Sequence, residues 1–251
     1  MKETMLYETI FKRKSIRKYD LTPMNEDVLN EISNHIQNLK PMYENIKTEI
    51  SVVAHKDIKG LMAIKAPHYI VAYSEVKEGY LPNIGFMLQQ IDLYLSAKGV
   101  GSCWLGLAKP AKEILAKSQL EFVITLAIGR AMEPLHREGV SEFKRKTLTE
   151  ITDIKDRGEL LEAARLAPSA TNSQPWFFKG GEGLIHGYCI KHNLVKAMIY
   201  ERLNKVDMGI AFCHLWLAAK NQGRAVVFIA DETAREDRPK GYDYTATASI
   251  E

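Results

Sequence analysis

Apolar residues recur with helical spacing in two segments of the chain, residues 83–101 and 207–223. Each segment predicts a helix with one apolar face, because residues three and four apart lie on the same side of a helix. The two faces match position by position, pairing Ile84 with Met208, Met87 with Ala211, Leu88 with Phe212, Ile91 with Leu215 and Leu95 with Ala219. The same alignment superimposes two pairs of glycines, Gly85 with Gly209 and Gly99 with Gly223. Glycine commonly ends a helix, so each helix is expected to stop at the second glycine of its segment.

Weaker correspondences surround these two helices. Opening helices are predicted at 27–36 and 158–167, strands at 49–55 and 183–190, and short apolar runs after the long helices at 100–107 and 225–231. The first half carries two additional predicted strands, 66–74 and 122–129, and a charged crossing loop is expected at 130–146. Residues 242–250 alternate as a half-buried strand does.

These elements predict an α+β fold in which sheets are flanked by helices and one half of the chain repeats the other. The halves would be residues 1–151 and 152–251. The alternative is that the matches are chance similarities, which proteins built of helices and strands commonly show.

Composition places the chain among ordinary globular proteins. Its 251 residues are 46% hydrophobic and 26% charged, with a net charge of +3, which is too small to indicate nucleic-acid binding by itself. Three cysteines without metal-binding or redox spacing favour free thiols in a reducing cytoplasm. Its apolar segments are shorter than the roughly 20 residues of a membrane span, and its first residues have no apolar run typical of a signal peptide.

A basic segment near the N-terminus, residues 12–17 (KRKSIR), has the chemistry of a phosphate site. Arginine supplies planar, bidentate donors to a phosphate, and Arg13, Ser15 and Arg17 would face the same way on an extended backbone. Two other interpretations stay open. The segment is a solvated basic stretch, or it is a nucleic-acid patch, although it lacks the interleaved aromatic residues of such patches.

Two further segments offer surfaces for a flat polar ligand. Residues 168–176 (PSATNSQPW) place hydroxyl and amide side chains between two prolines, which predicts a rigid loop rich in donors and acceptors. Residues 99–106 (GVGSCWLG) contain three glycines, which let a backbone approach a ring system closely. The alternative for the second segment is an ordinary buried strand after a helix.

In this combination the sequence resembles the nitroreductase family of FMN oxidoreductases. The resemblance rests on KRKSIRKYD, GVGSCWLG, FVITLAIGRAMEP and FKRKTLTEI in that order, and on PSATNSQPWFF, which follows them instead of standing behind the first motif. In that family FMN lies between two subunits, and the loop comes from the other subunit. Each half of this chain keeps what the other lacks. The chain therefore resembles the single-chain TM-type nitroreductases, with a family dimer fused into one polypeptide.

The resemblance implies a set of FMN contacts on this chain. Phosphate and ribityl contacts fall to Arg13, Lys14, Ser15 and Arg17, and a late phosphate contact falls to Lys144 and Arg145. The flavin ring would lie against Trp104, Leu105 and Gly106, with backbone N–H groups of the last two near N5. The second half would close the site with Pro168, Ser169, Ala170 and Asn172.

The implied activity is hydride transfer from NAD(P)H through FMN to a small acceptor such as a nitroaromatic or a quinone. The flavin carries this chemistry, so no catalytic side chain, metal, nucleic acid or membrane is expected, and further oligomers are compatible with the pseudo-dimer. Three alternatives remain: a non-catalytic or sensory flavin-binding protein, a dehalogenase-like relative, and a nucleic-acid binder.

Overall fold

The computed structural model describes residues 3–59, 64–155, 158–181, 183–192 and 194–251. Its α-helices are α1 (Glu3–Ile10), α2 (Glu26–Ile36), α3 (Tyr80–Ala97), α4 (Lys112–Leu115), α5 (Leu148–Ile151), α6 (Gly158–Arg165), α7 (Leu194–Asn221) and α8 (Glu232–Glu236). Its strands are β1 (Thr48–Ala54), β2 (Ile58–Lys59), β3 (His68–Ser74), β4 (Gly101–Leu105), β5 (Lys109–Pro110), β6 (Glu121–Gly129), β7 (Trp176–Gly181), β8 (Leu184–Ile190), β9 (Val226–Ile229) and β10 (Tyr242–Ile250). Short 3-10 turns are η1 (His55–Asp57), η2 (Val140–Glu142) and η3 (Ala170–Asn172). The α+β prediction is confirmed.

Two four-stranded antiparallel sheets have the same construction. Their strand orders are β1-β3-β6-β4 and β7-β8-β10-β9. In both cases the chain supplies a helix, two strands, a long helix and two strands, so β1 corresponds to β7, β3 to β8, β4 to β9 and β6 to β10. The strands expected at 66–74 and 122–129 are present as β3 and β6, but they are not additional to the second half, because β8 and β10 correspond to them. The expected match of 49–55 with 183–190 is wrong, since β1 corresponds to β7. Among the described residues, β7 and the two-residue strands β2 and β5 were not predicted.

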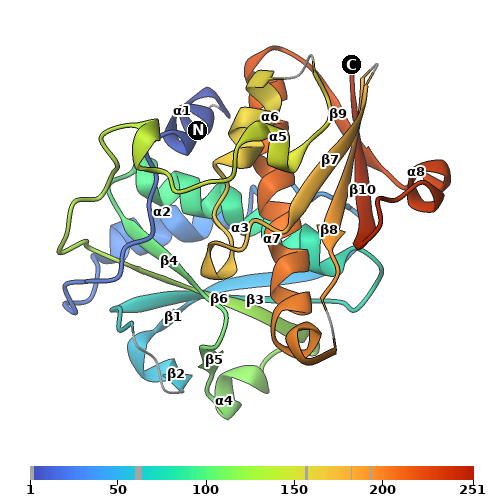
Figure 1. Ribbon diagram of the computed structural model, residues 1–251. Helices are drawn as coiled ribbons and strands as arrows, with labels where there is room; N and C mark the ends of the chain where they lie inside the picture. Colours follow the sequence, from blue (N-terminus) through green and yellow to red (C-terminus); the bar gives the residue numbers. More distant parts are fainter. Residues whose placement is uncertain (1–2, 60–63, 156–157, 182, 193) are drawn as a thin grey trace.

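The long helices α3 and α7 cross in the middle of the molecule (Figure 1). A Cβ on Gly85 would lie 2.0 Å from the carbonyl oxygen of Val206, and a Cβ on Gly209 would lie 1.9 Å from that of Pro82. Val206 lies 124 positions after Pro82, the same offset that relates the two glycines. Such reciprocal contacts are typical of an isologous, twofold interface. Only glycine permits this approach of two backbones.

Each long helix packs on its own sheet, and the two helices share one core. Helix α3 contacts β3 and β4, whereas α7 contacts β8, β9 and β10. One hydrophobic cluster runs through both layers and includes residues from both halves. The boundary between residues 151 and 152 stays a prediction. Within the described ranges, no helix is long and apolar enough to cross a membrane.

The segment that leaves β6 connects the first sheet to the second and supplies residues to the site described below. It first runs beside the N-terminal segment, where Tyr19 bridges Ala131 and Arg13 bridges His136. It then passes η2 and α5, and Thr152 forms a parallel bridge with Phe178 at the edge of the second sheet. Residues 130–146 thus cross between the halves, as the sequence predicts.

Candidate functional site

The basic N-terminal segment is held against β4 by its apolar residue. Ile16 is fully buried beside Gly101, where a Cβ would lie 3.0 Å from Ile16 Cγ1. The Ile16 N–H donates to the Ser102 carbonyl at 2.9 Å. Because side chains alternate on an extended backbone, Ser15 and Arg17 point away from this core. They line a cavity on the other side.

This cavity has a volume of about 510 Å³ and is rich in cations. Its walls come from the N-terminal segment, the crossing segment and the 168–172 loop. It is lined by Arg13, Lys14, Ser15, Arg17, Glu133, Arg137, Glu142, Lys144, Arg145, Pro168, Ser169, Thr171 and Asn172. The cavity is referred to below as the cationic cavity.

Two arginines of the cationic cavity repel each other. Burial and the neighbouring Arg13 and Arg137 lower the pKa of Arg145 to about 10, and burial with Arg13 lowers that of Arg137 to about 10. Both guanidinium groups stack on the ring of Phe143, at 5.6 and 4.0 Å from its centroid. Within the described part of the chain, no carboxylate forms an ion pair with Arg17, Arg137 or Arg145. A bound anion would relieve this repulsion.

The 168–174 loop has an unusual backbone. Thr171, Asn172 and Gln174 adopt φ angles of 52°, 59° and 48°, in the left-handed region that favours glycine. No other non-glycine residue in the described ranges does so. Each such residue costs of order 1–3 kcal/mol unless its surroundings enforce the conformation. Strain of this kind concentrates at ligand sites.

Contacts from the first half enforce that conformation. Asn172 Nδ2 donates to the Lys144 carbonyl at 2.8 Å, and Arg145 Nη1 donates to Asn172 Oδ1. The Lys146 N–H donates to Gln174 Oε1 at 2.7 Å. The crossing segment therefore places Lys144 and Arg145 at the loop, although they are more than 20 residues away from it in the chain.

Asp207 of α7 anchors the start of the loop. The Ala170 N–H donates to both of its carboxylate oxygens, at 3.2 and 3.0 Å. Burial raises the pKa of Asp207 well above its usual value. The equivalent residue on α3 is Asn83, whose Oδ1 accepts the N–H groups of Met42 and Tyr43 at 2.8 and 3.0 Å. The two halves thus use related side chains for one task.

A smaller cavity of about 130 Å³ adjoins the cationic cavity. The two share Ser15, Arg17, Pro168, Ser169 and Thr171. The smaller cavity, called the β4 cavity below, is further lined by Cys103, Trp104, Gly106, Ile124, Ala170, Leu203, Asp207 and Ile210. In the described residues the indole N–H of Trp104 is buried without a hydrogen-bond partner.

The structure thus brings the predicted contact residues to two adjoining cavities. Leu105 is the exception, because its side chain packs against the core behind β4 and lines neither cavity. Sequence reasoning missed Arg137, Glu133 and Asp207. Arg137 belongs to the charged segment 130–146, where composition alone does not single it out. The Glu133 carboxylate accepts the Arg17 and Lys18 N–H groups and so holds the basic segment.

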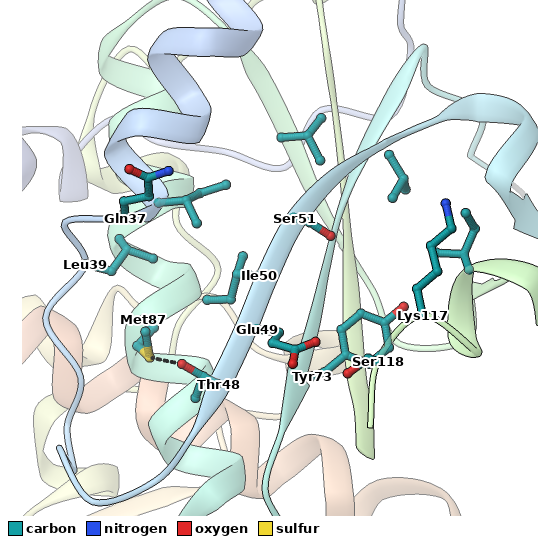
Figure 2. Close-up of a pocket in the computed structure, with 14 residues that line it drawn as sticks. Gln37, Leu39, Thr48, Glu49, Ile50, Ser51, Tyr73, Met87, Lys117 and Ser118 are labelled. Atoms are coloured by element: carbon teal, nitrogen blue, oxygen red, sulfur yellow. Dashed lines mark hydrogen bonds between the residues drawn. The ribbon is translucent and has the colours of Figure 1, made fainter. Parts of the chain in front are cut away.

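A wider hollow of about 690 Å³ runs along the open edge of β1 (Figure 2). Ile50, Leu39 and Met87 lie on one side of the strand, and Glu49 and Lys117 lie on the other. All of its lining residues come from the first half. Its described lining has a single cation opposite a carboxylate, so it offers no comparable anion site despite its size.

Comparison with known proteins identifies the family. The profile of a family described as "Putative TM nitroreductase" matches residues 5–219. The chain belongs to this family. No curated protein is significantly similar to the chain in sequence.

Three solved structures similar to this chain differ in how much of it they cover. A crystal structure described as a putative nitroreductase from Thermotoga maritima is 24% identical, with a TM-score of 0.65, and the match covers 99% of this chain and 94% of that one. A nitroreductase family protein from Clostridium novyi is 23% identical with a TM-score of 0.42, covering 50% of this chain and 86% of its own. An FMN-dependent nitroreductase from Clostridium difficile is 15% identical with a TM-score of 0.43, covering 58% and 100%. The first of these shows a shared nitroreductase-like fold along nearly the whole chain.

Proposed function

We propose that this nitroreductase family member is an FMN-dependent oxidoreductase that binds one FMN per chain and transfers hydride from NAD(P)H to a small acceptor such as a nitroaromatic or a quinone. One observation carries the proposal: the cationic cavity and the β4 cavity adjoin, and residues from both halves of the chain line each of them. FMN has a dianionic phosphate at one end and a flat ring at the other, which matches this pair of cavities.

The cationic cavity suits the phosphate and ribityl end. Arg17, Arg137 and Arg145 face it without a carboxylate partner in the described part of the chain. Lys14 and Lys144 add positive charge at its walls. Charge-assisted hydrogen bonds from arginine to phosphate are about twice as strong as neutral ones. The anion would therefore stabilise cations that the protein has already assembled.

The β4 cavity suits the flavin ring. Trp104, Gly106 and Ile210 line it with flat or apolar surface. Leu105 and Gly106 would present backbone N–H groups to it. Bound FMN would supply the hydride chemistry, while this chain binds and orients it and keeps positive charge nearby. FMN fits better than FAD because the sequence has no dinucleotide-binding glycine fingerprint.

If the chain is the fused pseudo-dimer that we propose, a second flavin site would lie at the equivalent place in the other half. That place is filled by side chains, so we expect a single site per chain. There, Gly79, Phe86 and Phe228 correspond to Leu203, Ile210 and Trp104. The Tyr43 ring fills the space over Gly79, where a Cβ would lie 2.6 Å from Tyr43 Cε2. Phe86 and Phe228 pack edge to face with centroids 5.3 Å apart. Protein side chains thus occupy the position that the β4 cavity has in the first half.

Three buried, free cysteines also support the predicted cytoplasmic location.

The test begins with the purified protein. It should be yellow, release FMN on heating, and contain one FMN per chain by absorbance and scattering mass. Anaerobic NADH or NADPH should bleach the flavin, and a nitroaromatic or quinone should restore its absorbance. Recovery of FAD, of no flavin after reconstitution, or of two flavins per chain would contradict the proposal. Flavin that dithionite reduces and neither nicotinamide does would favour the sensory alternative.

A further inference from the structure

A buried carboxylate lies behind the cationic cavity. Asp92, in the middle of α3, has 0% of its side chain exposed, and its partner Arg13 has 3%. Asp92 Oδ2 lies 2.6 Å from Arg13 Nε, a close ion pair that is not aligned as a hydrogen bond. Arg13 Nη2 does donate to Asp92 Oδ1, at 3.3 Å. A buried ion pair commonly costs more in desolvation than its attraction returns, so its presence calls for a role other than stability.

We infer that Asp92 is a positioning residue for the flavin phosphate: it fixes Arg13, and through Arg13 the whole 13–17 segment, at the wall of the cationic cavity. The inference rests on the proposed FMN function. Arg13 Nη2 also donates to Ser15 Oγ at 3.2 Å, so the guanidinium that Asp92 holds in turn orients the hydroxyl beside it.

The same carboxylate also reaches β4. The Ser102 hydroxyl donates to Asp92 Oδ1, and the Ser102 carbonyl accepts the Ile16 N–H at 2.9 Å. Asp92 therefore links α3, the phosphate-binding segment and the strand that lines the β4 cavity. β4 is also held by its pairing with β6, so the loss of Asp92 acts first on the 13–17 segment.

The second half shows that the helix crossing does not itself require an acid here. The residue 124 positions after Asp92 is Trp216, which is buried on α7 at the equivalent place. The run most like residues 12–17 is KRKT at 144–147, and its Arg145 donates to the Ala167 carbonyl and to Asn172 of the 168–174 loop. Asp92 therefore stands on the helix whose neighbouring arginine it pairs with, whereas an aromatic side chain fills the core at the equivalent place on α7. Asp92 thus accompanies Arg13 and not the helix pair.

Without Asp92 the Arg13 guanidinium would be a buried charge with no counter-ion. It would move toward water or toward the cavity, because an unpaired buried charge is strongly unfavourable. Ser15 and Arg17 would follow it, being two and four residues along the same extended segment. The loss should therefore affect phosphate binding in particular and ring binding little.

The test compares FMN with riboflavin, which has the same ring and no phosphate. Apo-protein is titrated with each flavin by fluorescence, for the parent and for Asp92→Asn. We expect FMN affinity to fall about tenfold to a hundredfold, the effect of losing one charge-assisted contact, and riboflavin affinity to change less than about threefold. Asp207→Asn is the matched control, since it is a buried acid that holds the loop, and it should change both affinities alike.

The outcomes separate the two proposals. A parent that binds neither flavin refutes the FMN function. A parent that prefers FMN, with Asp92→Asn lowering both affinities equally or neither, overturns the positioning role. If Asp92→Asn does not fold, the double variant Arg13→Met/Asp92→Leu replaces the pair by apolar side chains of similar length. It should fold and lose most of the preference for FMN over riboflavin, and a retained preference would overturn the inference.

Discussion

Arg145 offers a sharp test of the cationic cavity, through the substitution Arg145→Gln. Its guanidinium donates to the carbonyls of Ala167 at 3.0 Å and Leu166 at 3.3 Å, and to Asn172 Oδ1. Each of these bonds contributes about 0.5–1.5 kcal/mol. Against them stands the repulsion by Arg137 and the burial that lower the Arg145 pKa from 12.5 to about 10. That lowering corresponds to at most about 3–4 kcal/mol, and to less once solvent screening of its exposed part is included.

The two effects nearly cancel in the apo-protein. We expect Arg145→Gln to change the stability of the apo-protein by no more than about 2 kcal/mol, or a few degrees in melting temperature for a chain of this size. FMN binding loses a charge-assisted hydrogen bond of about 1.5–3 kcal/mol. That loss weakens the affinity by roughly one to two powers of ten.

Fluorescence titration with FMN and thermal melts with and without FMN measure both quantities. Arg165→Gln is the matched control, because Arg165 pairs with Glu162 in the same region and does not line the cavity. It should leave FMN affinity within about threefold of the parent. The reasoning is refuted if Arg145→Gln binds FMN as tightly as the parent, or if the control weakens binding equally.

Two further predictions concern the helix crossing and the loop anchor. Gly209→Ala would drive a methyl group into the Pro82 carbonyl and should lower the stability measured in thermal melts by about 3 kcal/mol or more. Gly158→Ala is the control, because nothing lies within 4 Å of the new Cβ, and it should leave stability unchanged. Equal effects of the two substitutions would contradict the close crossing. Asp207 has a folded-state pKa above its unfolded value near 3.8, so the folded state binds its proton more tightly and stability declines as pH rises from about 3.8 through the folded pKa. Asp207→Asn, the amide that Asn83 supplies at the equivalent place, should remove this decline, and parallel pH profiles of melting temperature for both proteins would rule the effect out.

Local patterns predicted the parts of the fold that local chemistry determines. The apolar stripes and the paired glycines predicted α3 and the C-terminal part of α7, because helix periodicity and a left-handed terminator are properties of neighbouring residues; α7 begins at Leu194, before the predicted segment 207–223. Gly99 and Gly223 indeed have φ angles of 81° and 75° just past the two helices. The alternation in the basic segment was readable only in part: Ile16 is buried and Ser15 and Arg17 are not, but Arg13 is buried as well, against Asp92.

Residues whose roles depend on distant neighbours escaped prediction. Arg137 contributes to the cationic cavity because the crossing segment returns to the N-terminal segment and places it beside Arg13. There, Arg137 Nη1 donates to the Arg13 carbonyl. Asp92 left one signal, a charged residue within a helix that is otherwise buried on almost every side. Such a helix leaves an acid no solvent to face, so Asp92 needed a buried partner. The sequence does not say that the partner is Arg13, 79 residues away.

The proposed fusion of two halves into one chain would explain how such differences arise. In a homodimer every substitution occurs twice, so a buried aspartate suited to a phosphate clamp also stands in the second copy, whether or not that copy needs it. The single chain that we propose is free of this constraint. It has Asp92 on one helix and Trp216 on the other, and Asn83 beside one loop and Asp207 beside the other. Each half can then lose what the proposed site does not use. The first half keeps the basic segment 13–17 and β4, and the second half keeps the 168–174 loop. In the proposed pseudo-dimer, the twofold relation is kept at the backbone crossing of Gly85 and Gly209, while the side chains around the crossing differ between the halves.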